Sequence, residues 1–299
     1  MRNEAPLSRL HRALVIATGR NSAWIAVDGE STPRIAQLRR ASGKRSMPVP
    51  GDVVHVRILE DDRTVVDRID ARAFTLERRS VDGRAKTMAA NVDMLVTVTA
   101  LANPPPRTIT LDQLLAFAEL EEIGSAVVFT KPDMADPGET LRFVETYGAL
   151  GYPVLVLNPK SGAGVEALRE LIAGHHALLS GVSGVGKSTI FRALGGEGAT
   201  GDVSRHGLGR QTTTTARLYR MGEGFLIDSP GVNEFGLGTI GPAELAEAFR
   251  EMRPLVPGCR FTDCSHRAEP GCAVKLAVEQ GRMAPSRYAS YLKMLESPT

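Results

Sequence analysis

The 299 residues of the chain suggest two or three domains, and 42% of them are hydrophobic, which is enough to fill ordinary cores. No apolar run approaches the ~18 residues that a membrane-spanning helix needs, and the run at residues 13–17 is too short for the core of a signal peptide. These features exclude the membrane-spanning class and predict a soluble, cytoplasmic protein.

The formal net charge of +2 hides an uneven distribution along the chain. Residues 1–90 hold 17 lysines and arginines against 11 acidic residues, whereas residues 91–299 hold 19 against 23. A basic N-terminal third favours a polyanionic partner for that part of the chain. An ordinary solvated surface is also compatible with the charge alone.

Short β-rich runs separated by turn residues dominate the first 72 residues. Clear runs lie at residues 14–17, 24–27 and 53–58, and five short strands in this length would suit a small barrel. An OB-fold is the first candidate, and an SH3-like barrel fits the pattern equally well. The loop from Arg39 to Arg45 places four cations among small residues, as contacts with a phosphate backbone would require. Residues 73–91 are expected to form a polar connection.

From residue 92 onward, runs typical of strands alternate with runs typical of helices. This alternation predicts an open parallel α/β sheet that binds its ligands at the carboxyl ends of the strands. The segment Asn103-Pro-Pro-Pro106 interrupts the pattern after the first strand. The expected strands are residues 92–98, 126–129, 154–157, 177–179 and 225–227, and the expected helices are residues 110–123, 139–150 and 189–194.

The second of these strands leads into Thr130-Lys-Pro-Asp133, which resembles the guanine-reading N-K-x-D motif of GTPases. Asp133 would accept hydrogen bonds from the ring and exocyclic N–H groups that guanine has and adenine lacks, and the stem of Lys131 would lie along the base. Thr130 replaces the usual Asn, and its hydroxyl can do part of the work of the missing amide. Residues 158–164 follow the next strand, where GTPases place a second base loop. Lys160 is the candidate contact in this loop, and a plain turn with a helix N-cap fits equally well.

The segment from Gly181 to Ser188 fits G-x-x-x-x-G-K-[ST] at every specified position, between an apolar run and a helix-like run. Glycines let the backbone N–H groups turn inward around phosphate oxygens, and the helix that follows presents its positive N-terminus to the same anion. Lys187 is expected to reach the β- and γ-phosphates, and the Ser188 hydroxyl to ligate Mg²⁺. The chain is therefore predicted to bind a nucleoside triphosphate. The residues expected to do so here are Gly181, Val182, Ser183, Gly184, Val185, Gly186, Lys187, Ser188 and Thr189.

Two further segments resemble the switch regions of GTPases. In Gly209-Arg-Gln-Thr-Thr-Thr-Thr215, Thr213 is expected to ligate Mg²⁺ and to sense the γ-phosphate. In the D-x-x-G motif Asp228-Ser-Pro-Gly231, Asp228 would hold Mg²⁺ through water and the Gly231 N–H would contact the γ-phosphate. Many GTPases place a water-orienting Gln directly after this glycine, but Val232 stands there here.

The three cysteines of the chain, Cys259, Cys264 and Cys272, lie within fourteen residues together with His266. An odd, clustered count favours a metal site over disulfides, and a Cys₃His set fits one tetrahedral structural Zn²⁺ with no position left for water. Three buried free cysteines beside a chance histidine are the alternative. Residues 244–252 and 273–280 are expected to be helices that pack this lobe. Nearby cations that suit either RNA contact or a solvated face are Arg260, Lys275, Arg282 and Arg287.

The order of the motifs is a circular permutation, because an ordinary GTPase runs from P-loop through D-x-x-G to N-K-x-D. With a barrel before the permuted motifs and C-x₄-C-x-H-x₅-C after them, the chain resembles the RsgA/YjeQ/EngC family over nearly its whole length. These circularly permuted GTPases assist late assembly of the small ribosomal subunit. The resemblance implies Mg²⁺-dependent hydrolysis of GTP to GDP and phosphate, stimulated by the subunit. It also implies contact with ribosomal RNA through the barrel and the zinc lobe.

These observations predict an α/β fold: a circularly permuted P-loop GTPase domain with a mainly parallel sheet, between an OB-fold barrel and a helical zinc-binding lobe. The expected domains are residues 1–75, 76–240 (with 76–91 as a connection) and 241–299. A monomer is expected.

The family usually has His in a G-x-H-T-T-T string, and Gln211 takes its place here. Gln211 is expected to orient the attacking water, with Thr213 and Lys187 as the other catalytic residues, but glutamine does not titrate near neutral pH. A P-loop ATPase or kinase is disfavoured by Asp133. An RNA-binding protein with a vestigial nucleotide site is disfavoured because Lys187, Ser188, Thr213 and Asp228 are all present.

Overall fold

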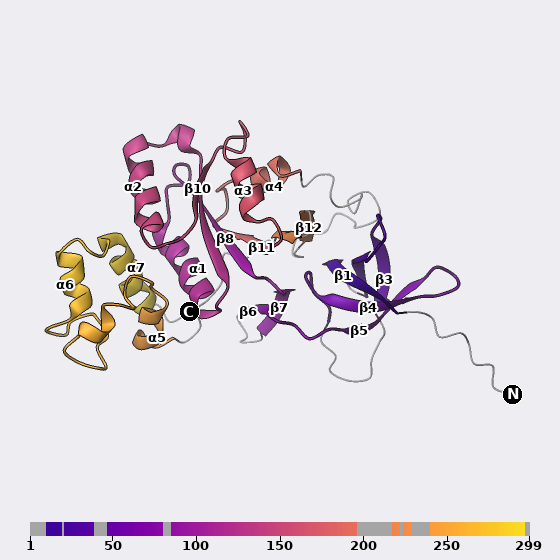
Figure 1. The fold of residues 1–299 in the computed structure, drawn as a ribbon, viewed down its shortest axis with the longest axis horizontal. Helices are drawn as coiled ribbons and strands as arrows, with labels where there is room; N and C mark the ends of the chain where they lie inside the picture. The colour runs from indigo at the N-terminus through magenta and orange to yellow at the C-terminus, as the bar shows by residue number, and fades with distance from the viewer. Residues whose placement is uncertain are drawn as a thin grey trace. The chain divides into compact units, whose positions relative to one another are not determined.

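The computed structural model describes residues 10–19, 21–38, 47–79, 85–195, 217–221, 224–228 and 240–296 (Figure 1). The chain divides into two compact units. One unit comprises residues 1–93, 172–178 and 195–231, and the other comprises residues 94–171, 179–194 and 232–299. Each unit contains a hydrophobic core of its own.

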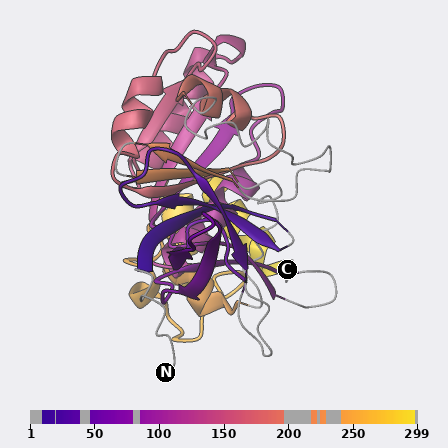
Figure 2. The same ribbon diagram turned by 90° about the vertical axis from the view of Figure 1, so that its right-hand side faces the viewer.

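The first five strands close into a barrel in the order β1-β2-β3-β5-β4 (Figures 1 and 2). The strands are β1 (Leu10–Thr18), β2 (Ser22–Val27), β3 (Arg34–Leu38), β4 (Val53–Ile58) and β5 (Thr64–Ile69). Neighbours are antiparallel except β3 and β5, which pair in parallel. Alternate side chains point inward, so that β2 buries Ala23, Ile25 and Val27 while its other residues remain partly exposed. The predicted five-stranded barrel is confirmed.

Two short strands follow the barrel where the sequence predicts only a polar connection. β6 (Thr75–Arg79) and β7 (Ala85–Ala90) pair antiparallel. The end of β7 lies against the barrel turn at Gly51, whose Cβ, if present, would stand 2.1 Å from the Ala90 carbonyl oxygen. Asn91 donates to the Gly51 carbonyl at 2.9 Å and accepts from the Ala73 N–H at 2.9 Å. The polar connection predicted over residues 73–91 thus contains two paired strands, which the sequence did not reveal because backbone pairing and close packing on glycine need few apolar side chains.

Six strands form the central sheet in the order β10-β9-β8-β11-β13-β12. β8, β9 and β10 pair in parallel, and β12 and β13 pair antiparallel. β8 is buried along its entire length, as expected of a strand inside an α/β sheet. The strands are β8 (Met94–Ala100), β9 (Gly124–Thr130), β10 (Val154–Leu157), β11 (His176–Ser180), β12 (Arg217–Met221) and β13 (Gly224–Asp228).

Helices cover the strands of the second unit. α1 (Thr108–Leu120) packs on β8 and β9, and both α2 (Pro137–Gly148) and α3 (Val165–Leu171) contact β10. α4 (Lys187–Ala193) follows the P-loop. Asp136 caps α2 by accepting a hydrogen bond from the Glu139 N–H at 2.9 Å.

The C-terminal lobe shares its core with α1. Its helices are α5 (Pro242–Glu247), α6 (Ala273–Glu279) and α7 (Pro285–Glu296). Ala116 of α1 belongs to the same buried cluster as Phe249 and Tyr291 of the lobe. α5 ends at Glu247, earlier than predicted, and α7 was not predicted. No helix in the described part of the chain is long and apolar enough to cross a membrane.

A buried ion pair joins the lobe to α1. The Arg287 guanidinium of α7 lies 2.6 Å from Asp112 Oδ1 and 2.7 Å from Glu251 Oε1. Tyr147 of α2 donates its hydroxyl to Asp112 at 2.9 Å. Burial alone would lower the pKa of Arg287, but the Asp112 and Glu251 carboxylates outweigh it and raise the pKa above its ordinary value. The guanidinium therefore remains charged between the two carboxylates.

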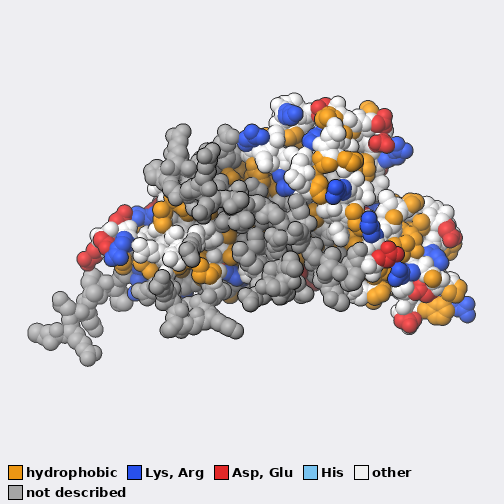
Figure 3. Space-filling model, turned by 180° about the vertical axis from the view of Figure 1, so that it is seen from behind, with side chains coloured by type: hydrophobic (Ala, Val, Ile, Leu, Met, Phe, Trp, Pro, Cys, Tyr) orange, Lys and Arg blue, Asp and Glu red, His pale blue; other side chains and the backbone are white. Residues whose placement is uncertain are grey.

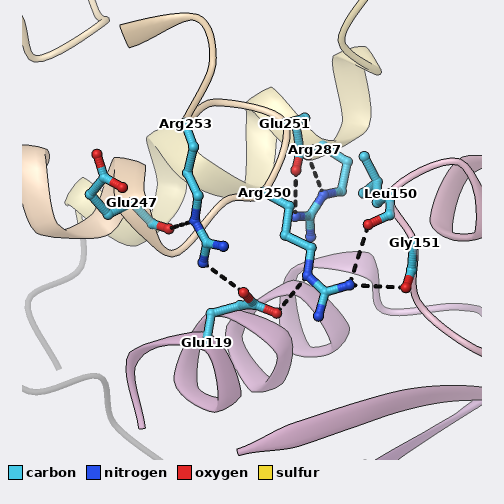
Figure 4. A network of polar contacts seen from close by, with 8 residues as sticks. All are labelled: Glu119, Leu150, Gly151, Glu247, Arg250, Glu251, Arg253 and Arg287. Carbon is cyan, nitrogen blue, oxygen red and sulfur yellow. Dashed lines mark hydrogen bonds and ion pairs between the residues drawn. The ribbon is translucent and has the colours of Figure 1, made fainter. Parts of the chain in front are cut away.

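A second, more exposed group of charges reinforces the same contact (Figure 4). Glu119, near the end of α1, accepts from Arg250 Nε at 2.7 Å and from Arg253 at 2.6 Å. Arg250 also donates to the Gly151 carbonyl at 3.0 Å and stacks 3.9 Å above the Tyr152 ring. The lobe is thus held to α1 by apolar packing, a buried ion pair and a peripheral one.

Candidate functional site

The P-loop begins in close contact with β8. A Cβ at Gly181, where φ is 147°, would lie 2.0 Å from the carbonyl oxygen of Val98, so no other residue fits this position. Gly186 has φ of 102° and directly precedes α4, which begins at Lys187. Val185 is buried between them, whereas Ser183, Gly184 and Ser188 are exposed. The predicted strand, loop and helix around the motif are confirmed.

Lys187 folds back over its own loop. Its Nζ donates to the carbonyl oxygens of Gly181 and Val182, the latter at 3.0 Å. These carbonyls hold the ammonium group beside the loop, where a phosphate oxygen would compete for the same donor.

Residues 130–133, the predicted base-reading motif, are hydrogen-bonded to the P-loop. Thr130, the last residue of β9, is buried and donates its hydroxyl to the Val185 carbonyl at 2.6 Å. The side chain of Lys131 donates to the carbonyls of Gly184, at 2.8 Å, and of Asn103. The two motifs are 55 positions apart in the sequence and yet meet directly. The Thr130 hydroxyl thus joins the end of β9 to the P-loop.

Asp133 lies on a short 3₁₀ turn (Pro132–Met134) and is exposed. Its Oδ1 accepts from the Asn158 side-chain amide at 3.1 Å. Lys160, the predicted contact in this loop, is exposed, and its backbone N–H donates to Asn158 Oδ1 at 3.3 Å. Sequence reasoning missed Asn158. The available signal was its position directly after β10, whose last residue, Leu157, pairs with Thr130.

The expected magnesium and catalytic residues are only partly described. Ser188 is exposed in the first turn of α4, and the Thr189 N–H bonds to the Gly186 carbonyl at 3.0 Å. Asp228 ends β13, but its side chain is outside the described part. Gln211, Thr213 and Gly231 also lie outside the described residues.

The four predicted zinc ligands converge. The ligand atoms of Cys259, Cys264, His266 and Cys272 all lie within 4.8 Å of one another. The Sγ atoms of Cys259 and Cys272 are each 3.5 Å from His266 Nδ1. A tetrahedral zinc with Zn–S of about 2.3 Å and Zn–N of about 2.0 Å separates such ligands by about 3.5 Å. The geometry and the donor types therefore fit zinc.

The protonation states also fit a metal. Burial raises the pKa of the Cys264 thiol to about 12, so a thiolate there needs a cation beside it. Burial lowers the pKa of His266, which favours the neutral imidazole that binds metals. Because the Cys264 thiol resists ionisation, binding of a metal there would release a proton, and the coordinate bonds would stabilise the lobe.

Hydrogen bonds fix the backbone around His266. Glu269 accepts from the Ser265 N–H at 2.7 Å, the Ser265 hydroxyl at 2.6 Å and the Arg267 N–H at 2.9 Å. These bonds, the Ser265 hydroxyl first, hold the pKa of Glu269 at about 2. Tyr288 donates to the His266 carbonyl at 2.7 Å. The ligand loop is thus held by groups that do not touch the ligand atoms.

Many of the described arginines form ion pairs with acidic side chains. On the face shown in Figure 3, basic side chains are interspersed with acidic and apolar ones. For Arg287, both RNA contact and a solvated position were wrong expectations, because it is buried and ion-paired. The loop from Arg39 to Arg45 lies outside the described residues. The barrel arginines with described side chains bond to acids or a histidine, in the pairs Arg12–Asp28, Arg34–Glu30, Arg57–Asp67, Arg63–Asp61, Arg68–His55 and Arg72–Asp52.

Comparisons with known proteins agree with this architecture. Residues 69–238 match the model of the RsgA GTPase family. The chain is 36% identical over 292 residues to the small ribosomal subunit biogenesis GTPase RsgA of Gemmatimonas aurantiaca, covering 94% of this chain and 95% of that protein. It is 37% identical over 289 residues to the protein of the same name from Pseudomonas aeruginosa, covering 94% of this chain and 85% of the relative.

Solved structures show the same fold. YjeQ from Thermotoga maritima superposes with a TM-score of 0.77 at 30% identity, covering 96% of this chain and 98% of that one. YloQ, a circularly permuted GTPase, superposes with a TM-score of 0.72 at 24% identity, covering 98% of this chain and 96% of that one. With its permuted motif order, its barrel and its Cys₃His cluster, the chain is a circularly permuted GTPase that belongs to the RsgA GTPase family.

Proposed function

We propose that this GTPase binds the small ribosomal subunit and assists its late maturation, hydrolysing GTP with stimulation by the subunit. The observation that carries the nucleotide part is the Thr130–Val185 hydrogen bond of 2.6 Å, which joins a guanine-reading motif to a phosphate-binding loop. The subunit is proposed as the partner because the relatives that share most of the chain's length are named for its biogenesis.

In this proposal, the segment from Gly181 to Thr189 surrounds the phosphates, and Lys187 leaves its loop carbonyls to neutralise the β- and γ-phosphate oxygens. Lys131 and Asp133 bind the base, Thr130 holds that motif to the P-loop, and Lys160 lies beside the base. The Gly231 N–H contacts the γ-phosphate.

Ser188, Thr213 and Asp228 would hold Mg²⁺. When bound, this ion stabilises negative charge on the β- and γ-phosphate oxygens. Gln211 orients the attacking water, because the side chain of Val232, at the position where many GTPases have Gln, has no polar group to do so.

One structural Zn²⁺ is proposed at Cys259, Cys264, His266 and Cys272. All four are protein ligands in a closed set, so the ion would stabilise the lobe and take no part in hydrolysis.

Ribosomal RNA is proposed to contact the barrel and the zinc lobe. The four cations from Arg39 to Arg45 support the barrel contact, and the exposed Arg260 and Arg282 support the lobe contact. A monomer acting in the cytoplasm is proposed, where small subunits are assembled.

The test is Mg²⁺-dependent turnover of GTP and of ATP by the purified protein, with and without isolated small subunits. We expect turnover of GTP only, accelerated by subunits, and co-sedimentation that is stronger with a non-hydrolysable GTP analogue than with GDP. Lys187→Ala serves as the control for contaminating GTPases. Equal use of ATP would refute the base assignment, and identical turnover with and without subunits would refute the partner.

A further inference from the structure

Asn158 occupies a position where two loops of the candidate base site meet. It directly follows β10, which runs parallel to β9, and Leu157 pairs with Thr130 in that register. Asp133 lies three residues after the end of β9. Because parallel neighbours end at the same edge of a sheet, the first residues after both strands lie side by side. The Asn158 side chain spans the remaining distance, with its Nδ2 at 3.1 Å from Asp133 Oδ1.

The orientation of the Asn158 amide is fixed by its own loop. Its Oδ1 accepts from the Lys160 N–H at 3.3 Å, which leaves the NH₂ group to face Asp133. Its backbone N–H bonds to the Ala163 carbonyl at 3.0 Å, and its own carbonyl accepts from both the N–H and the hydroxyl of Ser161 at 3.1 Å. Turning this donor away from Asp133 would also break the bond that the Asn158 Oδ1 accepts from the Lys160 N–H.

This contact matters because Asp133 is exposed. A free carboxylate on a surface turn rotates about its terminal torsion, whereas guanine needs two acceptor oxygens in the plane of its own two donors. An ionised carboxylate has about four acceptor positions, so one bond from Asn158 leaves enough for both guanine N–H groups. The amide therefore restrains the carboxylate without consuming its capacity to bind the base.

We propose that Asn158 is a positioning residue for guanine selection, which holds the Asp133 carboxylate in the orientation that accepts both the ring N–H and the exocyclic amino group. This inference rests on the proposed function, in which Asp133 reads guanine. It adds a selectivity determinant that does not itself contact the base.

A purely structural role is the competing explanation, since an Asn side chain that accepts from the N–H two residues later forms an ordinary turn. The variant Asn158→Asp keeps the turn but removes the donor, so unchanged GDP binding by this variant would assign the residue to the turn alone. Aspartate keeps the acceptor for the Lys160 N–H but replaces the donor to Asp133 with a second carboxylate. Asn158→Ala removes both functions, and Ser161→Ala is the matched control that weakens the loop without touching Asp133.

The experiment is competition by GDP, IDP and ADP against a fluorescent GDP derivative bound to the full-length variants, with folding checked by circular dichroism. Inosine lacks the exocyclic amino group, so the ratio of GDP to IDP affinity reports on the second hydrogen bond. We expect Asn158→Ala to weaken GDP binding about tenfold and to lower this ratio. Asn158→Asp should weaken GDP binding at least as much, and Ser161→Ala should leave the ratio at the wild-type value.

Wild-type behaviour of Asn158→Asp would overturn the inference, because the turn alone would then explain the residue. If both Asn158 variants lost the same factor in affinity for GDP and for IDP, the inference would also be overturned, because general damage to the loop would explain the loss. A wild-type protein that binds ADP as tightly as GDP would instead refute the proposed function itself, so the two failures are distinguishable.

Discussion

Replacing Arg287 with leucine is expected to destabilise the second unit by about 3–5 kcal/mol, the usual cost of leaving a buried charge without its partner. The Arg287 side chain is 2% exposed and the Asp112 side chain is fully buried, so water cannot replace the lost guanidinium. Asp112 would keep the hydrogen bond that it accepts from the Tyr147 hydroxyl at 2.9 Å but would lose its ion pair with Arg287. Glu251 would lose both of the hydrogen bonds that it accepts from Arg287.

The chain offers separate signals for its two units. All described helices lie in the second unit, so the helical circular dichroism signal follows it, whereas Trp24 lies in β2 of the first unit. Urea unfolding of Arg287→Leu, monitored by circular dichroism, is expected to show a lower free energy of unfolding for the second unit. Trp24 fluorescence serves as an internal reference for the first unit. Arg253→Leu is the matched control, because the Arg253 side chain is 41% exposed and its ion pair should contribute less than about 1 kcal/mol.

The destabilisation should depend on pH. Burial already raises the pKa of Asp112 against the opposing effects of Arg287, Ser290 and Tyr147, and without the guanidinium the folded state should hold a proton on Asp112 even more strongly. The folded variant then binds more protons than the unfolded chain, so its stability should fall as pH rises above the ordinary aspartate pKa of about 4. Joint replacement of Asp112 and Arg287 by leucine should cost less than Arg287→Leu alone. A loss for Arg287→Leu no larger than for Arg253→Leu would refute the reasoning.

Three further outcomes are expected. Thr130→Val should weaken GDP binding by about 1–3 kcal/mol in competition titrations, because the buried Val185 carbonyl loses its donor. Thr130→Ser should bind GDP like the wild type, and equal GDP affinities of the two variants would contradict this prediction. Gln211→Ala should lower the subunit-stimulated kcat for GTP while leaving GTP affinity nearly unchanged, and Gln211→His should retain activity with a new pH dependence near neutrality. If Gln211→Ala instead turns over GTP at the wild-type stimulated rate, another group must orient the attacking water. Elemental analysis should find one zinc per chain, and chelation should lower the helical unfolding midpoint and expose Cys264 to thiol reagents, whereas a zinc-free protein with three reactive thiols would contradict the metal site.

Features encoded in short segments could be predicted from the sequence. The P-loop prediction succeeded because Gly181 and Gly186 adopt backbone angles that favour glycine. The loop conformation therefore requires the glycines by which the motif is recognised. The barrel was recognisable because its strands are short, β-rich and separated by turn residues, and because β2 buries alternate apolar residues. The Cys₃His cluster needed only close spacing and suitable chemistry. The division of the chain at residues 75 and 240 stays a prediction.

Features that depend on distant partners could not be predicted. α7 was missed because its buried side includes Arg287, which reads as a surface residue until its carboxylates are placed around it. Asp112 likewise looks like an exposed helical residue, yet it is among the most buried groups of α1. Asn158 gains its importance only when β9 and β10 pair. Each of these cases needed contacts between residues far apart in the chain.

The Asp112–Arg287 pair also sets an order of events during synthesis. The two residues are separated by 175 positions, so at ~5–20 residues per second roughly 9–35 s pass between their incorporation. Throughout that interval Asp112 has no cation to accompany it into the core. A chain interrupted before residue 287 carries the P-loop and the predicted base-reading motif but leaves the Asp112 carboxylate of α1 without its Arg287 partner. Such fragments should be susceptible to proteolysis, so that only chains extending through α7 mature into a stable nucleotide-binding unit.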